Sequence, residues 1–171
     1  MIDLVPYVEL NGQRTLTDSF IKAFWDAICK DKSEDSLFAS KEVTTSEQFI
    51  SYLKQPANLP VFCFYEGQAS GVCWLNNIRK NAAMIHFCFL SNVWGKKALE
   101  CAEKILAHWF SFPDNKGGYL FDVLIGNTPA NNKLASRFAE NVGFTILGTV
   151  PKVEAHGIVV SYIERDKFNG R

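Results

Sequence analysis

Three residue patterns in this sequence could do chemistry. His86 lies in an alternating apolar run, and an imidazole that titrates near pH 6.5 can accept a proton from a reacting group. Gly95 precedes a helical pattern, and a helix N-terminus binds anions such as pyrophosphate. Asn132 opens a second helical pattern, where its side chain can cap the helix or bind a ligand. A buried, hydrogen-bonded core histidine is the competing interpretation of His86.

The elements that must position these residues follow from the hydrophobic periodicity. Runs with the composition of strands are Pro6–Leu10, Pro60–Tyr65, Ser70–Leu75, Ala82–Leu90, Tyr119–Ile125, Phe144–Val150 and Gly157–Glu164. Helical spacing predicts helices over about Asp18–Lys30, from Thr45 or Ser46 to Leu53, from Ala98 to Trp109, and over Asn131–Asn141. The polar stretches Asp31–Ser40 and Asn76–Asn81 are predicted to be loops.

The order of these elements predicts the fold class. Between Ala82 and Ile125 the chain forms a strand–helix–strand unit, so those two strands should be parallel. The strand pairs before and after it read as hairpins, which makes the sheet mixed. We therefore predict an α+β fold with helices on both faces of the sheet. No internal repeat or linker interrupts the chain, so residues 1–171 should form a single domain.

Composition and charge argue against several classes of function. Basic and acidic residues balance at 18 each, so no global field recruits nucleic acid or an anionic membrane. No apolar run approaches the roughly 20 residues that span a bilayer, and the N-terminus does not read as a signal peptide. Five cysteines without CxxC spacing fit a reducing, cytoplasmic location and no metal site.

Two segments carry a resemblance to a known family. The first is Asn92-Val93-Trp94-Gly95-Lys96-Lys97-Ala98, and the second is Asn132-Lys133-Leu134-Ala135 followed by Phe138 and Gly143-Phe144. They resemble the Gln/Arg-x-x-Gly-x-Gly/Ala and Asn-x-x-Ala/Ser signatures of the GNAT superfamily of N-acetyltransferases, and together they cover about Ala83–Pro151. The resemblance implies a GNAT-like, splayed sheet of about six to seven strands and acetyl-CoA as co-substrate.

The resemblance also implies roles for individual residues. The cofactor-binding set would be Cys88, Phe89, Leu90, Trp94, Gly95, Lys96, Lys97, Ala98, Asn127 and Asn132. Backbone groups of Cys88–Leu90 would bind the pantetheine arm, and an N–H near Phe89 or Leu90 would stabilise the oxyanion. His86 would be the catalytic base, as in family members of the serotonin acetyltransferase type.

The sequence departs from the family pattern at three positions. Asn92 replaces the usual Gln or Arg, and Lys97 stands where Gly or Ala is usual. Ala139 occupies the position of a Tyr that often serves as general acid. Two functions therefore stay open. One is direct transfer of acetyl from acetyl-CoA to a primary amine of a small-molecule or peptide acceptor, in a ternary complex. The other is a catalytically weakened CoA-binding or protein-interaction module. A homodimer is compatible with either.

Overall fold

The computed structural model describes residues 1–153 and 156–170. Contacts divide the chain into two compact units, one of Met1–Trp74 with Phe87–Cys101 and the other of Leu75–His86 with Ala102–Arg171. The predicted single domain is not tested by this division and stays a prediction. Among the described helices, none combines the length and apolar character needed to cross a bilayer. No disulfide joins the five cysteines.

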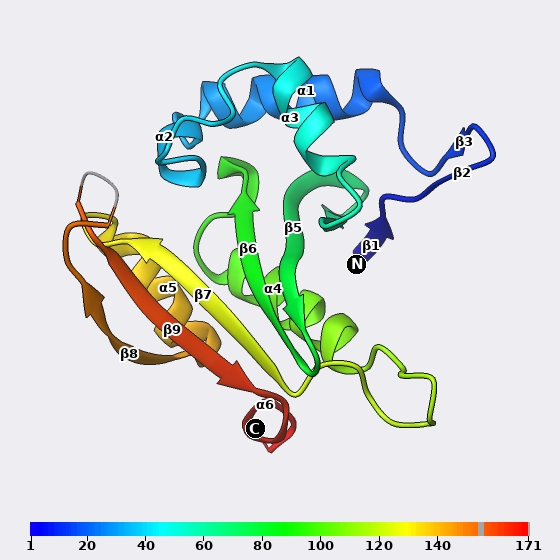
Figure 1. Ribbon diagram of the computed structural model, residues 1–171. Coiled ribbons are helices and arrows are strands. Elements are labelled where there is room, and N and C mark those ends of the chain that lie inside the picture. The colour runs from blue at the N-terminus through cyan, green and yellow to red at the C-terminus, as the bar shows by residue number, and fades with distance from the viewer. Residues whose placement is uncertain (154–155, 171) are drawn as a thin grey trace. The chain divides into compact units, whose positions relative to one another are not determined.

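Seven of the described strands form a mixed sheet (Figure 1). Its order is β1 (Ile2–Pro6), β4 (Leu59–Tyr65), β5 (Gln68–Arg79), β6 (Ala82–Phe89), β7 (Val123–Pro129), β9 (Ile158–Glu164) and β8 (Thr145–Val150). β1 with β4, β7 with β9, and β8 with β9 are antiparallel. β6 and β7 are parallel, with Ala82–Met84 opposite Val123–Ile125. The sequence prediction of a mixed sheet with this parallel pair is confirmed.

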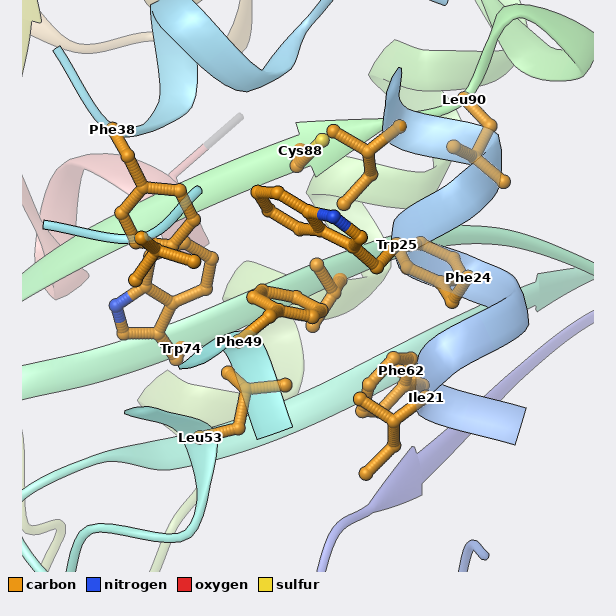
Figure 2. Close-up of a cluster of buried hydrophobic side chains, with 13 residues drawn as sticks. Ile21, Phe24, Trp25, Phe38, Phe49, Leu53, Phe62, Trp74, Cys88 and Leu90 are labelled. Atoms are coloured by element: carbon orange, nitrogen blue, oxygen red, sulfur yellow. The ribbon is translucent and has the colours of Figure 1, made fainter. Parts of the chain in front are cut away.

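The first unit is built on an aromatic core (Figure 2). α1 (Asp18–Lys30) presents Ile21, Phe24, Trp25 and Ile28 at helical spacing, and all four are buried. α3 (Ser46–Leu53) adds Phe49, which is fully buried with its ring 5.1 Å from that of Trp25. The two helices therefore cover one face of the strands with a continuous apolar layer.

Helices lie on both faces of β4. Side chains of successive strand residues point to opposite faces. Phe62 packs edge-on against Phe24 of α1, with ring centroids 5.2 Å apart. The next residue, Cys63, forms a thiol hydrogen bond with Cys101 of α4 (Lys96–Phe110). This bond, together with burial, raises the pKa of the Cys63 thiol. The predicted cover of both sheet faces by helices is confirmed.

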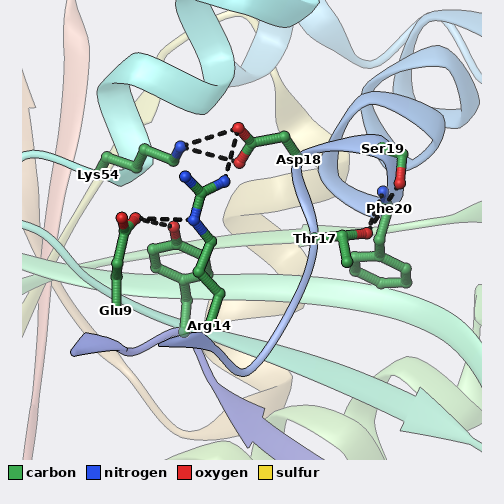
Figure 3. Close-up of polar contacts among 8 residues, drawn as sticks. Glu9, Arg14, Thr17, Asp18, Ser19, Phe20 and Lys54 are labelled. Carbon is green, nitrogen blue, oxygen red and sulfur yellow. Dashed lines mark hydrogen bonds and ion pairs between the residues drawn. The ribbon is translucent and has the colours of Figure 1, made fainter. Parts of the chain in front are cut away.

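A polar network fixes the start of α1 (Figure 3). It also involves a small hairpin of β2 (Glu9–Leu10) and β3 (Gln13–Arg14). Lys54 lies 2.8 Å and Arg14 2.8 Å from the Asp18 carboxylate, and Arg14 also pairs with Glu9 at 3.2 Å. The hydrogen bond from Lys54, followed by that from Arg14, holds the pKa of Asp18 below its usual range. The network orients the hairpin and α1, and its exposure keeps its contribution to stability modest.

The second unit packs helices against the β7–β9–β8 strands. Phe121, Leu124 and Ile163 are buried at 1% exposure or less. α5 (Lys133–Val142) ends at Gly143, whose φ of 104° is the left-handed conformation that favours glycine. α6 (Arg165–Asn169) follows β9 and places Phe168 5.5 Å from Phe110 of α4.

The sequence prediction was wrong in four places. In place of one strand over Pro6–Leu10, the chain forms β1, which ends at Pro6, and β2, which begins at Glu9 and, among the described strands, pairs only with β3. β5 continues through the polar residues to Arg79, because the far end of this strand is solvent-exposed and needs no apolar side chains. β7 begins at Val123 instead of Tyr119, because Asp122 bonds Asn81 and Arg165. A short helix, α2 (Glu34–Leu37), interrupts the predicted loop.

Candidate active site

The chain that leaves β6 is fixed to the first residues of β5. The Leu90 N–H donates to the Ser70 carbonyl at 2.9 Å. Two residues later, the Asn92 side-chain amide donates to the Ala69 carbonyl and to the Ser70 hydroxyl, each at 3.2 Å. The Leu90 N–H is therefore already used within the protein, which corrects its predicted part as an oxyanion donor. The same prediction for Phe89 stays a prediction.

Ser91, between these two residues, contacts α1. Its backbone N–H donates to Asp31 Oδ2 at 2.6 Å, and its hydroxyl donates to Asp31 Oδ1 at 2.7 Å. Ser91 begins a single 3-10 turn, η1 (Ser91–Val93), which has no partner for its first N–H within the turn itself. The Asp31 carboxylate therefore caps this turn from another element.

Trp94 and Gly95 complete the approach to α4. The Trp94 indole Nε1 donates to the Phe89 carbonyl at 2.9 Å, so the ring folds back over the end of β6. Gly95 has a φ of 84°, and a Cβ built on it would meet no heavy atom within 4 Å. α4 begins at the next residue, Lys96. The first N–H groups of this 15-residue helix have no partner within the helix, and the glycine before them leaves open space beside the backbone. Such an arrangement can bind an anion.

The two lysines of this segment differ in their surroundings. Lys97 Nζ lies over the Tyr65 ring, 4.9 Å from its centroid, in a cation–π contact. The Tyr65 hydroxyl donates to Glu100 one turn further along α4, at 3.4 Å. Lys96 and Lys97 are both exposed, whereas Ala98 is buried at 5% exposure. Lys97 is thus engaged by a ring of β4, and Lys96 is the better candidate for a phosphate contact.

The side chains of Cys88 and Leu90 point into the aromatic core of the first unit (Figure 2). They are 6% and 8% exposed. Burial, with a smaller effect of the Asp31 charge, raises the pKa of the Cys88 thiol to about 12. The thiol is therefore protonated at neutral pH and is a poor nucleophile. Any contact of Cys88 with a cofactor would use its backbone, as the sequence prediction has it.

His86, on the part of β6 within the second unit, is hydrogen-bonded. Its Nε2 lies 3.1 Å from Asn76 Oδ1 on β5. An amide oxygen only accepts, so Nε2 is the donor in this contact. Burial lowers the pKa of His86 to about 4. The expected titration near pH 6.5 is therefore wrong, and the ring is neutral at pH 7.

The lowered pKa of His86 predicts a loss of stability in acid. The unfolded chain binds a proton on this ring below about pH 6.5, whereas the folded protein resists it until about pH 4. Folding stability is therefore complete above pH 6.5 and falls as the pH drops toward 4, by about 2 kcal/mol at pH 5. Urea unfolding of wild type and His86→Gln at pH 8 and pH 5 measures this difference.

We expect His86→Gln to lose about 2 kcal/mol less than wild type between the two pH values. His156→Gln removes an exposed imidazole and serves as the matched control. Equal losses in wild type and His86→Gln would contradict the prediction.

The remaining predicted positions lie in the second unit. Asn132 caps α5, because its Oδ1 accepts from the Ala135 N–H at 3.0 Å. Of the two roles predicted for Asn132, the capping role is the one seen. Asn127 is exposed on β7, opposite Val160 of β9. Ala139 is half-buried on α5 and brings no proton donor in its side chain.

Comparisons with known proteins show which solved structures share this fold. No protein-family model matches the sequence, and no curated protein does. Solved structures do match. Spermidine N-acetyltransferase from Vibrio cholerae, crystallised with CoA and spermine, superposes with a TM-score of 0.75 over 98% of both chains at 12% identity. Aminoglycoside acetyltransferase AAC(6')-Ib with coenzyme A gives 0.74 over 99% of this chain and 98% of its own at 14% identity. The chain has the GNAT fold.

A third match is a protein acetyltransferase. RimL, the ribosomal L7/L12 alpha-N-protein acetyltransferase in complex with coenzyme A, superposes with a TM-score of 0.67 at 17% identity. The match covers 87% of this chain and 90% of RimL. The GNAT fold predicted from element order and the two signature segments is thus confirmed. At these identities the comparisons establish the fold, and activity is a separate question.

Sequence reasoning missed two polar contacts of this GNAT fold. Asp31 and Asn76 were both assigned to loops, yet one binds Ser91 and the other binds His86. A signal for Asp31 was present, because an acidic residue directly after a helix is electrostatically unfavourable and needs a partner. No local signal pointed to Asn76, whose contact with His86 depends on the register of β5 with β6.

Proposed function

We propose that this protein is an acetyl-CoA-dependent N-acetyltransferase that transfers acetyl directly to a primary amine in a ternary complex. The observation that carries the proposal is Gly95, held in the left-handed region with open space beside it, immediately before the 15-residue helix α4. This arrangement suits the pyrophosphate of CoA. The GNAT fold also supports CoA as the ligand, because the three solved structures named above contain CoA.

The N-terminus of α4 would bind the anionic end of the co-substrate. Its first N–H groups have no partner within the helix, and the helix dipole favours negative charge there. Glycine at position 95 lets a phosphate approach the backbone closely. Lys96, exposed at the first position of the helix, would add a charge-assisted contact.

His86 would accept the proton of the amine. In the transfer, the amine nitrogen bonds to the acetyl carbon, the bond from that carbon to the CoA sulfur breaks, and the nitrogen loses a proton. The neutral imidazole of His86 can take this proton, and the hydrogen bond between Nε2 and Asn76 orients the ring. A pKa of about 4 keeps the ring unprotonated and ready at pH 7, at the expense of base strength.

The acceptor is proposed to be a primary amine on a small molecule or a peptide. The solved relatives include enzymes named for spermidine, for aminoglycosides and for a ribosomal protein, so the GNAT fold accommodates all three kinds. Five cysteines without a disulfide fit action in a reducing cytoplasm. The homodimer stays a prediction.

Calorimetric titration with CoA tests the proposed function, and two glycine variants sharpen it. Gly95 and Gly117 share a φ of 84°, and a Cβ on either would meet nothing within 4 Å. Replacing either with alanine should therefore impose similar backbone strain, about 1–2 kcal/mol. Only Gly95→Ala places a methyl group where a phosphate would approach, so it should weaken CoA binding about tenfold or more.

Wild type and Gly117→Ala are expected to bind CoA alike. At 100 times its dissociation constant, CoA should stabilise both by about 2.7 kcal/mol. Failure of wild-type protein to bind CoA or acetyl-CoA at millimolar concentration would overturn the proposed function. Equal binding by Gly95→Ala and wild type would remove the α4 N-terminus as the site.

A CoA-binding module without turnover is the second candidate function. Ala139 favours it, because the resembling family often has a general-acid Tyr there and this α5 residue offers none. The low pKa of His86 favours it as well. Stabilisation by CoA without thioester consumption, across a panel of polyamines, aminoglycosides and peptides, would support this candidate over the first.

A further inference from the structure

We propose that Asp31 is a positioning residue for the acetyl-CoA site. Its carboxylate fixes the turn from Ser91 to Gly95, which carries the chain from β6 to the N-terminus of α4. The inference rests on the proposed function. It assigns a role to a residue that contacts no reacting atom and that acts through Ser91.

The contact between Asp31 and Ser91 is short and uses both carboxylate oxygens. One oxygen accepts from the backbone N–H at 2.6 Å, and the other accepts from the hydroxyl at 2.7 Å. Hydrogen bonds to an ionised carboxylate are shorter and stronger than those between neutral groups. Two such bonds to one residue fix its orientation as well as its position.

The place of Asp31 in its own helix calls for an explanation. Asp31 is the C-cap of α1, and its N–H bonds the Ala27 carbonyl. A helix C-terminus carries partial negative charge, so a carboxylate there is unfavourable. Residues that break a local rule are often found where another contact or a function compensates. The two bonds from Ser91 supply that compensation.

Hydrogen bonds from two other elements, β5 and α1, hold the turn, and those of Asp31 are the ones from α1. Leu90, before Ser91, bonds Ser70, and Asn92, after it, bonds Ala69. Asp31 adds an anchor from α1, 60 positions away in the sequence. The chain is thus fixed on both sides of Ser91 and at Ser91 itself, all within the first unit.

Charge and geometry predict opposite effects for the loss of Asp31. A carboxylate near an anion-binding helix terminus repels phosphate, so its removal would strengthen CoA binding if charge alone mattered. Loss of the anchor would loosen the turn and weaken binding, because small displacements of positioning groups are costly. We expect geometry to dominate in Asp31→Ala, with CoA binding weakened on the order of tenfold.

Asp31→Asn separates the two effects. The Asn side-chain oxygen can accept from the Ser91 N–H, while the Ser91 hydroxyl turns to accept from the Asn amide. This variant removes the charge and keeps two hydrogen bonds. It should therefore bind CoA within about threefold of wild type. Asp26→Ala, which removes an exposed carboxylate from the same helix, is the matched control.

Calorimetry with CoA and hydrogen exchange without ligand together test the proposal. Asp31→Ala should bind CoA more weakly than wild type, Asp31→Asn and Asp26→Ala, with the affinity for the amine unchanged. Amides of residues 91–98 should exchange faster in Asp31→Ala than in wild type, and should not exchange faster in Asp31→Asn or Asp26→Ala. The Ser91→Ala and Asp31→Ala effects on CoA affinity should not add in the double variant, because both act through one contact.

Two outcomes would overturn the positioning role. One is CoA binding by Asp31→Ala that equals or exceeds wild type. The other is unchanged exchange over residues 91–98. Failure of wild type to bind CoA would instead reject the proposed function, and the exchange measurement would still decide whether Asp31 fixes the turn.

Discussion

Gly71→Ala is expected to lower the free energy of unfolding by about 3 kcal/mol. Gly71 lies on β5 directly beside the end of β6. A Cβ at this position would lie 2.5 Å and 2.9 Å from two ring carbons of Phe89 and 3.1 Å from the Cys88 carbonyl oxygen. Distances this short cannot persist, so either the ring or the backbone of β6 must move.

Phe89 and Cys88, the two neighbours of Gly71, both make other contacts that a shift would disturb. The Phe89 ring stacks on the Phe87 ring, with centroids 5.9 Å apart. The backbone carbonyl of Phe89 accepts a hydrogen bond from the Trp94 indole N–H. Cys88 is buried in the aromatic core. Forcing extra volume into such a site typically costs 1–3 kcal/mol, and this overlap belongs at the upper end. The lower chain entropy of unfolded alanine offsets less than about 1 kcal/mol.

Urea denaturation of wild type, Gly71→Ala and Gly118→Ala checks this expectation. A Cβ on Gly118 would approach only the Asp114 carboxylate, whose nearest atom lies 3.2 Å away. This carboxylate accepts from the N–H groups of Lys116 and Gly118 in an exposed loop, so a shift of a few tenths of an ångström would lengthen these bonds without disturbing a packed core. The control should stay within about 0.5 kcal/mol of wild type. Equal stability of Gly71→Ala and wild type would contradict the expectation, because it would show that the end of β6 accommodates the methyl group without loss of packing.

His86→Gln is expected to lower kcat about 10²- to 10³-fold while leaving CoA affinity within about twofold of wild type. Glutamine keeps a polar side chain that can still donate to Asn76, and it removes the basic nitrogen. The effect corresponds to about 3–4 kcal/mol of lost transition-state stabilisation. Binding would change little, because a base acts on the amine proton and not on the phosphates.

Steady-state kinetics with a saturating amine, paired with calorimetry for CoA, measures this split. His108→Gln is the matched control, since burial also lowers the pKa of His108 but that ring packs against Trp109 on α4, with centroids 4.9 Å apart. The control should turn over at the wild-type rate. If the kcat of His86→Gln equals that of wild type, His86 is not the base. The interpretation of His86 as a buried, hydrogen-bonded core residue would then be favoured.

Local signals in the sequence predicted most of the element pattern. The Asn11-Gly12 dipeptide is a turn signal, and in the structure it joins β2 to β3 with positive φ at both residues, 52° and 78°. Gly143 ends α5 in the left-handed conformation for which glycine is suited. These signals work because they depend on a few neighbouring residues. Strand ends such as that of β5 were missed where exposed polar residues continue a strand.

The sequence by itself determined that Gly95 opens a long helix after a strand and that His86 lies on that strand. Only the tertiary structure decided what surrounds them. Asp31 meets Ser91 across 60 positions, and Asn76 meets His86 through the pairing of two strands. The pKa of His86 falls to about 4 because burial disfavours its charged form. Backbone conformation is encoded locally, whereas partners and burial arise from contacts between distant segments, which no single stretch of residues specifies.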